Sequence, residues 1–339
     1  MLKPIISKVV EGQSLNEMEA EKAMDIIMSG EGTQAQIGAF LTALRLKGET
    51  VEEITGFARS MRRRAASIVP KTRTFVDTCG TGGDGSQTFN ISTTAAFVVA
   101  GAGVAVAKHG NRSVSSRCGS ADMLEALGIK IDLPPEAVAC CLEEVGMAFL
   151  FAPVFHSAMK HAAGPRREIG IRTVFNLLGP LTNPASAPCQ LMGVYDPNLT
   201  ETVAGVLKRL GTKRAYVVHG SDGLDEISTT GETKITVLDN GEIKTFNLTP
   251  EEVGLPRARL SDLTGGTAED NANIAKAVLS GEKSPARDIV VLNAAFALLA
   301  GGATSNLTKA IEIAKESIDS GRALAKLKAM VAWGESWVA

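Results

Sequence analysis

From Phe75 onward, short apolar runs alternate with longer segments of helical periodicity, and no other feature limits the fold of this chain as strongly. The sequence predicts buried strands at Phe75–Asp77, Val104–Ala107, Met147–Ala152, Gln190–Val194 and Arg214–Val218. It predicts helices at Ser92–Ala100, Pro135–Val145 and Thr200–Leu210, and a mostly helical tail from Ala268. Such alternation is typical of a largely parallel sheet covered by helices, so we expect an α/β fold.

One pair of strands is expected to be antiparallel. Ile235–Leu238 and Glu242–Phe246 flank Asn240–Gly241, and Asn-Gly between two apolar runs is a strong signal for a tight hairpin.

The first 65 residues have a different pattern, which predicts three capped helices. The first carries a capping box at Ser14 and Glu17, the second covers Gln34–Lys47, and the third begins with a capping box at Thr50 and Glu53. Pro70 and the polar residues after it mark a boundary. We therefore predict a small N-terminal helical domain over residues 1–68, on which part of 160–185 packs, and an α/β catalytic domain over residues 69–339.

Composition restricts the class of partner and the compartment. The formal net charge is −2, so no global field attracts nucleic acid or a membrane, and a polyanion needs a local cluster of positive charge. The N-terminus turns polar too soon for a signal peptide, and the longest apolar stretch, Ala95–Ala107, is too short to cross a bilayer. The five cysteines show no C-x-x-C spacing, so we expect reduced thiols and a cytoplasmic location.

Two glycine- or hydroxyl-rich motifs suggest binding of phosphate. Asp77–Ser86 follows a strand, and its glycines allow backbone amides to approach an anion closely. It matches neither the Walker loop nor the dinucleotide fingerprint, and alone it is also compatible with an ordinary glycine-rich turn. Asn90–Thr94 precedes an Ala/Val-rich helix, where free amides and the helix dipole favour a phosphate. Helix capping by Ser or Thr is expected there as well.

Two further motifs come after strands. Lys108–Ser113 combines positive charges with small polar residues, as a phosphate site does, although a solvated basic loop is the simpler alternative. Asp225 and Glu226 are adjacent carboxylates on a glycine-flanked loop, which suits a hard cation such as Mg²⁺, although a solvated turn is the alternative. His156, His161 and His219 are expected to be structural.

Taken together, these motifs resemble those of the anthranilate phosphoribosyltransferase family, which shares its fold with the pyrimidine nucleoside phosphorylases. The resemblance covers essentially the whole chain. Its most specific elements are Gly80–Asp84, Asn90–Thr93, Lys108–Arg112, Gly164–Thr173 with Phe175–Pro184, and Asp225–Glu226.

The resemblance implies transfer of a phosphoribosyl group from phosphoribosyl pyrophosphate (PRPP) to the amine of anthranilate, in tryptophan biosynthesis. The residues implied to bind PRPP are Gly80, Gly82, Gly83, Asp84, Thr88, Asn90, Ile91, Ser92, Thr93, Lys108, His109, Gly110, Asn111, Arg112, Ser113, Ser115, Ser116 and Ser120. Those implied to contact anthranilate are Gly80, Asn111 and Arg166, and those implied to bind two Mg²⁺ ions are Ser92, Asp225 and Glu226. No residue is assigned as nucleophile or general base, and a homodimer joined through the helical domain is expected.

Two alternative functions make different predictions. A nucleoside phosphorylase would use inorganic phosphate, with a different phosphate loop and without Asp225 and Glu226. A non-enzymatic nucleic-acid-binding relative would have a basic surface and eroded motifs, whereas here the net charge is −2 and the motifs are intact.

Overall fold

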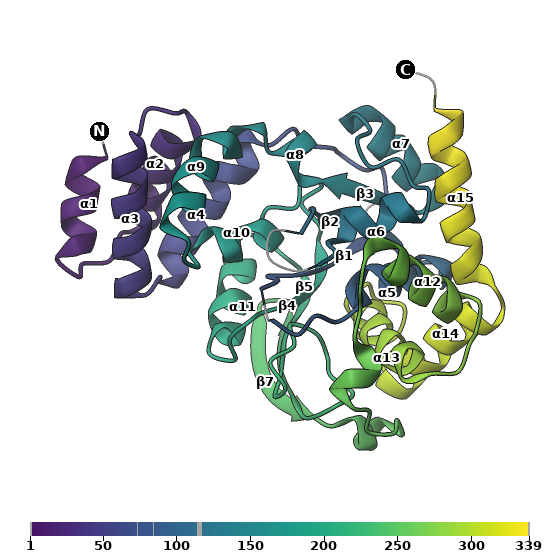
Figure 1. The fold of residues 1–339 in the computed structure, drawn as a ribbon. Coiled ribbons are helices and arrows are strands. Elements are labelled where there is room, and N and C mark those ends of the chain that lie inside the picture. The colour runs from purple at the N-terminus through teal and green to yellow at the C-terminus, as the bar shows by residue number, and fades with distance from the viewer. Residues whose placement is uncertain (1, 73, 84, 114–116, 338–339) are drawn as a thin grey trace.

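The structure is a computed structural model that describes residues 2–72, 74–83, 85–113 and 117–337. Figure 1 shows a small group of helices at the N-terminal end beside a larger layered α/β region. The sequence prediction of this fold class is confirmed. None of the helices in the described residues is long and apolar enough to cross a membrane.

Residues 2–72 contain four helices, where the sequence predicts three. They are α1 (Lys3–Val10), α2 (Glu17–Met28), α3 (Gln34–Lys47) and α4 (Val51–Arg64). The prediction of α3 and of the Thr50 cap of α4 is confirmed. Helix α1 was not predicted because no side chain caps it; it packs against α3 and buries Leu2 and Val9.

The cap predicted for α2 is wrong by two residues. Its capping box is made by Asn16 and Glu19, not by Ser14 and Glu17. The reason lies between the two positions: Leu15 is buried, and its N–H donates to the buried Glu53 carboxylate at 2.9 Å. That contact fixes an extended approach to the helix, so the helix begins only after Asn16.

The strands of the described residues form one seven-stranded sheet in the order β3-β2-β1-β4-β5-β6-β7. Neighbours are parallel from β3 to β5, and the β5–β6 and β6–β7 pairs are antiparallel. The predicted hairpin is confirmed, with positive φ at Asn240 (46°) and Gly241 (89°) between its strands. The bounds are β1 (Phe75–Gly80), β2 (Ala105–Gly110), β3 (Met147–Phe151), β4 (Cys189–Gly193), β5 (Arg214–Gly220), β6 (Thr233–Asp239) and β7 (Glu242–Leu248).

Helices cover both faces of this sheet. The predictions of α5, α7 and α11, and of a helical tail, are confirmed. The helices are α5 (Ile91–Gly101), α6 (Ser120–Ala126), α7 (Pro135–Val145), α8 (Ala152–Phe155), α9 (Lys160–Ile169), α10 (Phe175–Leu181), α11 (Leu199–Arg209), α12 (Ala268–Leu279), α13 (Pro285–Ala300), α14 (Leu307–Asp319) and α15 (Arg322–Ser336). Short 3₁₀ helices lie at Ser157–Met159, Pro250–Val253 and Leu260–Leu263.

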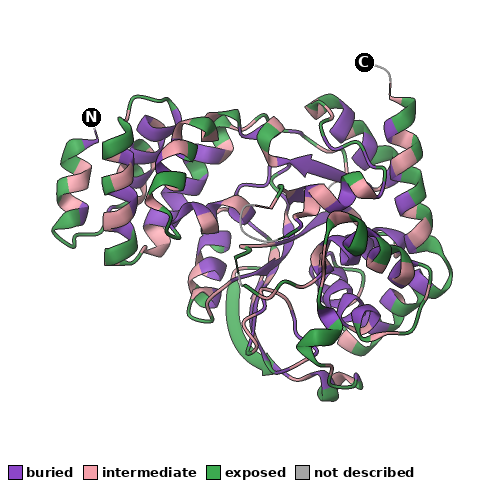
Figure 2. Ribbon diagram, in the orientation of Figure 1, coloured by how far each residue is buried: buried purple, intermediate pink, exposed green. Residues whose placement is uncertain are grey.

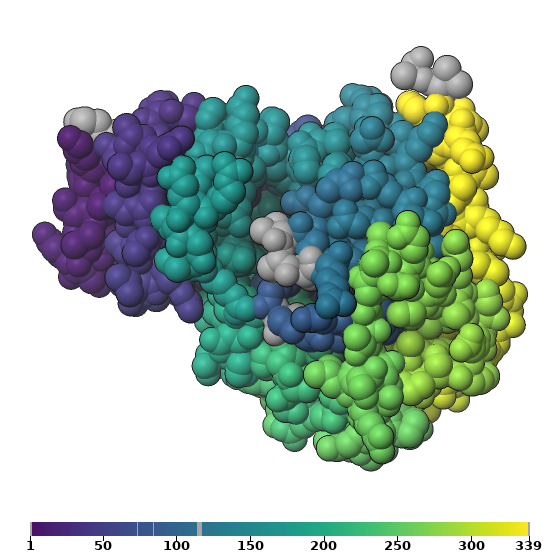
Figure 3. All heavy atoms as spheres, viewed as in Figure 1, coloured from purple at the N-terminus to yellow at the C-terminus, as the bar shows by residue number. Residues whose placement is uncertain are grey.

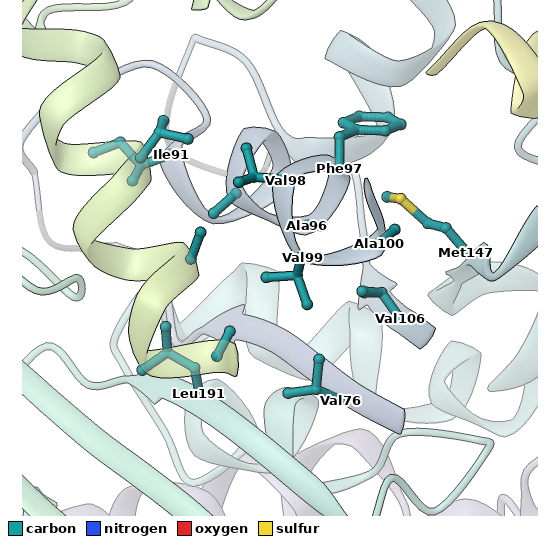
Figure 4. Close-up of a cluster of buried hydrophobic side chains, with 14 of the residues drawn as sticks. Val76, Ile91, Ala96, Phe97, Val98, Val99, Ala100, Val106, Met147 and Leu191 are labelled. Atoms are coloured by element: carbon teal, nitrogen blue, oxygen red, sulfur yellow. The ribbon is translucent and has the colours of Figure 1, made fainter. Parts of the chain in front are cut away.

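The strands at the centre of the sheet contribute to two different apolar cores. On β4, Leu191 belongs to the core around α5 and α13, whereas Met192 belongs to the core shared with α11 and the N-terminal helices. Figure 4 shows the first core, with Val76 and Val106 of the sheet facing Val99 of α5. In Figure 2 these strands are purple over most of their length, whereas the edge strand β7 is green. Burial on both faces explains why the parallel strands read as continuous apolar runs.

The segment 160–185 contacts the N-terminal helices. Helix α9 packs against α2 and α3, helix α10 packs against α4, and the Arg62 Nε donates to the Leu181 carbonyl at 2.8 Å. The predicted packing of this segment therefore agrees with the contacts, while the boundary at residue 68 stays a prediction.

The end predicted for β2 is wrong. The sequence ends this strand at Ala107 because Lys108 and His109 are polar, but the ladder with β3 continues through Lys108, His109 and Gly110. Lys108 and His109 are buried, so the charged side chain lies within the sheet and not on a loop after it. The cost of burying it is offset by polar partners at this end of the sheet, which are described below.

Candidate functional site

The glycine-rich motif does not follow β1 as predicted: its first residues, Asp77–Gly80, are the last four of the strand, and the rest continues beside β4 and the loop that follows β5. A Cβ on Gly193 would overlap the backbone carbonyl of Asp225, and one on Gly80 would overlap the Asp225 carboxylate. Gly82 and Gly83 have positive φ angles of 64° and 69°, and the Gly82 N–H donates to Asp225 Oδ2 at 2.7 Å. Glycine is therefore required at the two strand ends for close approach, and the predicted phosphate nest meets the predicted metal ligands directly.

The Glu226 carboxylate lies at the N-terminus of α5. Its Oε1 accepts a hydrogen bond from the Ser92 N–H at 3.0 Å, which is the position where the sequence predicts a phosphate. Burial, with the neighbouring Asp225 charge as a second cause, raises the pKa of Glu226 to about 8. Asp225, Glu226 and Ser92 are thus brought together as predicted, and the carboxylate uses the free amide of the helix end.

The Asn90–Thr93 segment does not cap α5 with its side chains. Asn90 is the N-cap residue, and no side chain makes a capping bond there, so the predicted capping by Ser or Thr is wrong. The Glu226 carboxylate accepts the hydrogen bond from the Ser92 N–H at the helix end, in place of a Ser or Thr hydroxyl. The Asn90 side chain instead joins neighbouring segments: it donates to the Cys118 carbonyl at 3.3 Å and accepts from Asn271 of α12 at 2.9 Å.

Lys108 reaches the same end of the sheet from β2. Its ammonium donates to the Thr78 carbonyl on β1, and the Thr78 hydroxyl donates to the Ser92 carbonyl at 3.0 Å. Burial lowers the pKa of Lys108, and the charges of Asp77, Glu226 and Asp225 oppose that change. A single buried cation thus stands close to the carboxylate pair, where it offsets part of their charge.

A metal ion fits this arrangement only if a ligand completes its coordination. Asp225 and Glu226 offer carboxylate oxygens and Ser92 offers a hydroxyl, which are ligands that Mg²⁺ prefers. Within the described part of the chain, no three His, Cys, Asp or Glu side chains gather into a metal-binding group. Mg²⁺ is usually held by one or two carboxylates with substrate phosphates and water, and the Gly82 and Gly83 nest lies on the adjacent segment.

The loop after β2 is held by ion pairs and hydrogen bonds. Arg112 pairs with Asp122 at 3.0 Å and with Glu125 at 2.5 Å, which raises its pKa. The Ser113 N–H donates to Asp122 Oδ2 at 3.1 Å, and the Ser120 hydroxyl donates to the Asn111 carbonyl at 3.1 Å. The Arg112 guanidinium is therefore paired with two carboxylates in this structure. Ser115, Ser116 and Asp84, also predicted to bind PRPP, lie outside the described residues.

His109 and Thr88 are turned toward other partners. The His109 ring contacts the Gly179 carbonyl at 3.1 Å and lies 5.2 Å from the His156 ring, between centroids. Burial, with His156 as a second cause, lowers the pKa of His109 to about 3. Thr88 forms an isolated antiparallel bridge with Thr264. Ile91 and Thr93, in the first turn of α5, are buried.

Arg166 projects from α9 toward α10. Its guanidinium lies over the Phe175 ring, 5.0 Å from the centroid, and burial lowers its pKa. The neighbouring Arg167 is exposed, as expected for two adjacent residues that diverge by about 100° on a helix. Figure 3 shows a hollow between the teal segment that contains α9 and α10 and the blue segment of the α/β region.

Sequence reasoning missed Arg172 and Asn183. Arg172 donates to the Gly83 carbonyl and stacks over Tyr195, 4.6 Å from the ring centroid. Asn183 is buried and donates at 2.8 Å both to Asp77 Oδ2 and to the Ala107 carbonyl, so it joins β1 to β2. Both lie in or next to the motif segments that carry the resemblance, but nothing in their local pattern separates them from solvated polar residues.

Known proteins match the chain over both of its regions. Residues 72–324 match the α/β domain of a glycosyl transferase family, and residues 3–65 match the helical bundle domain of that family. Anthranilate phosphoribosyltransferase of Moorella thermoacetica is 77% identical over 339 residues, which is 100% of both chains. The protein of that name from Acetivibrio thermocellus is 58% identical over 338 residues, or 100% of this chain and 98% of its own.

Solved structures agree with the sequence matches. The crystal structure of anthranilate phosphoribosyltransferase from Thermus thermophilus has a TM-score of 0.93 at 46% identity, covering 98% of this chain and 99% of that one. The enzyme from Saccharomyces cerevisiae in complex with PRPP and Mg has a TM-score of 0.91 at 30% identity, covering 99% and 98%.

Proposed function

The chain belongs to the anthranilate phosphoribosyltransferase family, and from this premise we propose that its active site is the polar cluster at the carboxyl ends of β1, β2 and β5. The reaction of the family moves the 5-phosphoribosyl group of PRPP to the amine of anthranilate and releases pyrophosphate, in tryptophan biosynthesis. One observation carries the proposed site: the Gly82 N–H and the Ser92 N–H, from two predicted phosphate-binding motifs, each donate to one of the adjacent carboxylates Asp225 and Glu226.

The proposed PRPP site is the set of residues named from the family resemblance. In it the amides of the 80–84 segment and the N-terminus of α5 would hold the pyrophosphate. Lys108 would neutralise phosphate charge from a fixed position, because its buried ammonium already stands near both carboxylates. Arg112 would have to leave Asp122 and Glu125 to reach a phosphate.

The proposed metal ligands are Asp225, Glu226 and the Ser92 hydroxyl, for two Mg²⁺ ions. Magnesium binding in the family is supported by the yeast structure with PRPP and Mg, whereas the number of ions is our proposal. When bound, Mg²⁺ neutralises charge on the leaving pyrophosphate. The chain holds Asp225 near the nest through the Gly82 amide, and it holds Glu226 at the helix end through the Ser92 amide.

Anthranilate is proposed to contact Gly80, Asn111 and Arg166. Arginine suits a carboxylate or an aromatic ring, because its planar fork can pair with the first or stack on the second. The aromatic amine is neutral near pH 7, so it can attack the ribose carbon without a strong base. The task of the chain is then to orient the two substrates and stabilise the leaving charge, and no residue is assigned as nucleophile or base.

Three further statements are proposals about the molecule as a whole. We propose a homodimer joined through the helical domain, a division of the chain at residue 68, and a cytoplasmic location. The first is supported by exposed apolar side chains on the N-terminal helices, namely Val10, Met18 and Leu46. The last is supported by the spacing of the cysteines, which contains no C-x-x-C pair.

One assay tests the proposed function against both alternatives. Anthranilate fluorescence should fall only when protein, PRPP and Mg²⁺ are all present, and omission of any of them should stop the loss. Release of base from a nucleoside with inorganic phosphate, without reaction of anthranilate, would support a nucleoside phosphorylase. Binding of nucleic acid without either reaction would support the non-enzymatic alternative.

A further inference from the structure

Asn293 is a fully buried polar residue in α13, between the apolar Leu292 and Ala294. An amide in such surroundings costs free energy unless its hydrogen bonds are made. Here they are made: Oδ1 accepts from the Ile227 N–H at 2.9 Å, and Nδ2 donates to the Ile227 carbonyl and to the Ile289 carbonyl, each at 2.9 Å. Two of the three bonds go to a single residue outside the helix.

Ile227 directly follows the proposed ligand Glu226. Its N–H belongs to the peptide group that joins it to Glu226, and its carbonyl belongs to the next peptide group. The Asn293 amide pairs with both, as a neighbouring strand would, and so fixes the backbone on both sides of Ile227. The Ile227 side chain is itself fully buried, so a movement of this part of the loop would have to expose it.

The other side of the carboxylate pair is fixed by a different element. The Asp225 carbonyl lies against Gly193 at the end of β4 so closely that a Cβ there would overlap it. Asp225 and Glu226 thus stand between two anchored points of backbone, one at β4 and one at α13. Adjacent carboxylates repel each other, and a loop anchored on one side only could relieve that repulsion by moving them apart.

We propose that Asn293 is a positioning residue of the metal site, which fixes Ile227 and thereby holds Glu226 beside Asp225 and Ser92. Residues that hydrogen-bond to the support of metal ligands are known to affect metal affinity by about 10- to 100-fold, because they set ligand orientation in advance. The inference rests on the proposed role of Asp225 and Glu226 as ligands. It adds to that role a residue that no motif contains and that lies 66 positions along the chain from Ile227.

Ser317 supplies a matched control. It is also fully buried in a C-terminal helix, and its hydroxyl donates to the Val98 carbonyl of α5 at 2.7 Å. Ser317→Ala therefore removes a buried bond from a side chain to the backbone, as Asn293→Leu does, but it touches no residue of the 221–230 loop. A general loss of stability should appear in both variants, whereas a loss of metal affinity should appear in one.

The experiment measures Mn²⁺ binding in the presence of PRPP by electron paramagnetic resonance, together with the Mg²⁺ concentration for half-maximal activity. For Asn293→Leu we expect both constants to weaken by about 10- to 100-fold, with an unchanged KM for anthranilate. Asn293→Ser, which leaves room for a water molecule, should show a smaller change in the same direction. Hydrogen exchange at the Ile227 amide should be faster in both Asn293 variants. Ser317→Ala should leave Mn²⁺ binding, the Mg²⁺ concentration for half-maximal activity and this exchange rate at the parent values.

The outcomes separate this inference from the proposed site. If folded Asn293→Leu binds Mn²⁺ as the parent does, or if Ser317→Ala weakens Mn²⁺ binding as much, the positioning role is overturned while the ligand assignment stands. If Asn293→Leu does not fold, Asn293→Ser decides by the same criterion. Asp225→Asn is measured alongside them, and unchanged Mn²⁺ affinity in that variant would overturn the ligand assignment and this inference together.

Discussion

At the scale of single residues, the site depends on Gly193 because glycine has no Cβ atom. A Cβ there would overlap the Asp225 carbonyl, so Gly193→Ala must displace the backbone of the carboxylate loop. Because a misplacement of about 1 Å can cost about 100-fold in rate, we expect activity to fall by about 100-fold. The Mg²⁺ concentration for half-maximal activity should rise. Steady-state kinetics over a Mg²⁺ series would measure this. Gly205→Ala on α11 is the control, since its Cβ would meet Val51 at an ordinary 3.5 Å; equal kinetics in the two variants would contradict the account.

The acceptor assignment is also tested by a residue pair. Arg166 is partly buried over Phe175, whereas Arg167 is exposed, so only the first is suited to hold a ligand. Loss of a charged hydrogen bond is worth about 1.5–3 kcal/mol, so Arg166→Ala should raise the KM for anthranilate about 10- to 100-fold with a smaller effect on that for PRPP. Arg167→Ala should change either constant less. The reverse order in steady-state kinetics would move the acceptor site elsewhere.

A site residue could be predicted from the sequence only where the residues next to it indicate its role. Asp225 and Glu226 could be named as candidate ligands because two adjacent carboxylates follow a strand on a glycine-flanked loop, although the pair alone is also compatible with a solvated turn. Asn293 and Asn183 could not, because a single asparagine is ordinary in sequence and acquires its role only from a backbone group far along the chain.

At the scale of elements, β2 and the segment after α8 are joined through a buried pair of imidazoles. Burial lowers the pKa of His109 to about 3 and that of His156 to about 4, against 6.5 for an exposed histidine. Below pH 6.5 the unfolded chain binds protons that the folded chain does not, so the free energy of unfolding falls as the pH is lowered from 6.5 to about 4 for His156 and to about 3 for His109. At pH 5 each histidine lowers the free energy of unfolding by about 2 kcal/mol.

His156→Gln tests this pH dependence. The variant should lose less stability than the parent between pH 7 and pH 5, since it lacks one of the two groups that take up a proton on unfolding. Thermal unfolding at a series of pH values measures the difference. His161→Gln is the control, because His161 is only partly buried and lies outside the pair. Identical slopes for the parent and His156→Gln would show that the imidazoles are not held neutral.

The boundaries of elements were predicted less well than their existence, and the reasons are tertiary. Lys108 reads as the end of a strand because it is charged, yet pairing with β3 and the polar groups around its ammonium keep it inside β2. Helix α1 has no side-chain cap and forms because α3 covers it. The α3 and α7 bounds, by contrast, are those that the local sequence predicts.

At the scale of the whole molecule, the proposed dimer can be tested on exposed apolar side chains of the helical domain. Met18 and Leu46 are 77% and 83% exposed, so both side chains are available for contact with a second copy of the chain. Sedimentation equilibrium should give twice the chain mass of 35.5 kDa, and Met18→Asp with Leu46→Asp should give the monomer. Val69→Asp, at an 87% exposed position just outside the helical domain, is the control. A monomeric parent protein would contradict the proposal.

The fold class at this scale follows from the sequence pattern, whereas the packing of α9 and α10 on the helical region does not. Apolar runs predict the sheet because they are buried on both faces, and the capped helices before residue 65 predict a separate helical region. That α9, which carries Arg166, and α10 pack on that region depends on contacts such as Arg62 to Leu181 that no local pattern encodes.

In the proposed site Asp225 and Glu226 hold Mg²⁺ for PRPP, and a calorimetric titration can test this role. The binding of PRPP is measured by calorimetry with and without Mg²⁺, for the parent and for the variant with both Asp225→Ala and Glu226→Ala. Burial, with repulsion from Asp225 as a second cause, raises the pKa of Glu226, so these carboxylates carry a cost in the folded state that the variant lacks, and the variant should remain folded. We expect Mg²⁺ to strengthen PRPP binding to the parent and to have no effect on the variant. A folded variant whose PRPP affinity and activity still respond to Mg²⁺ as the parent's do would contradict it.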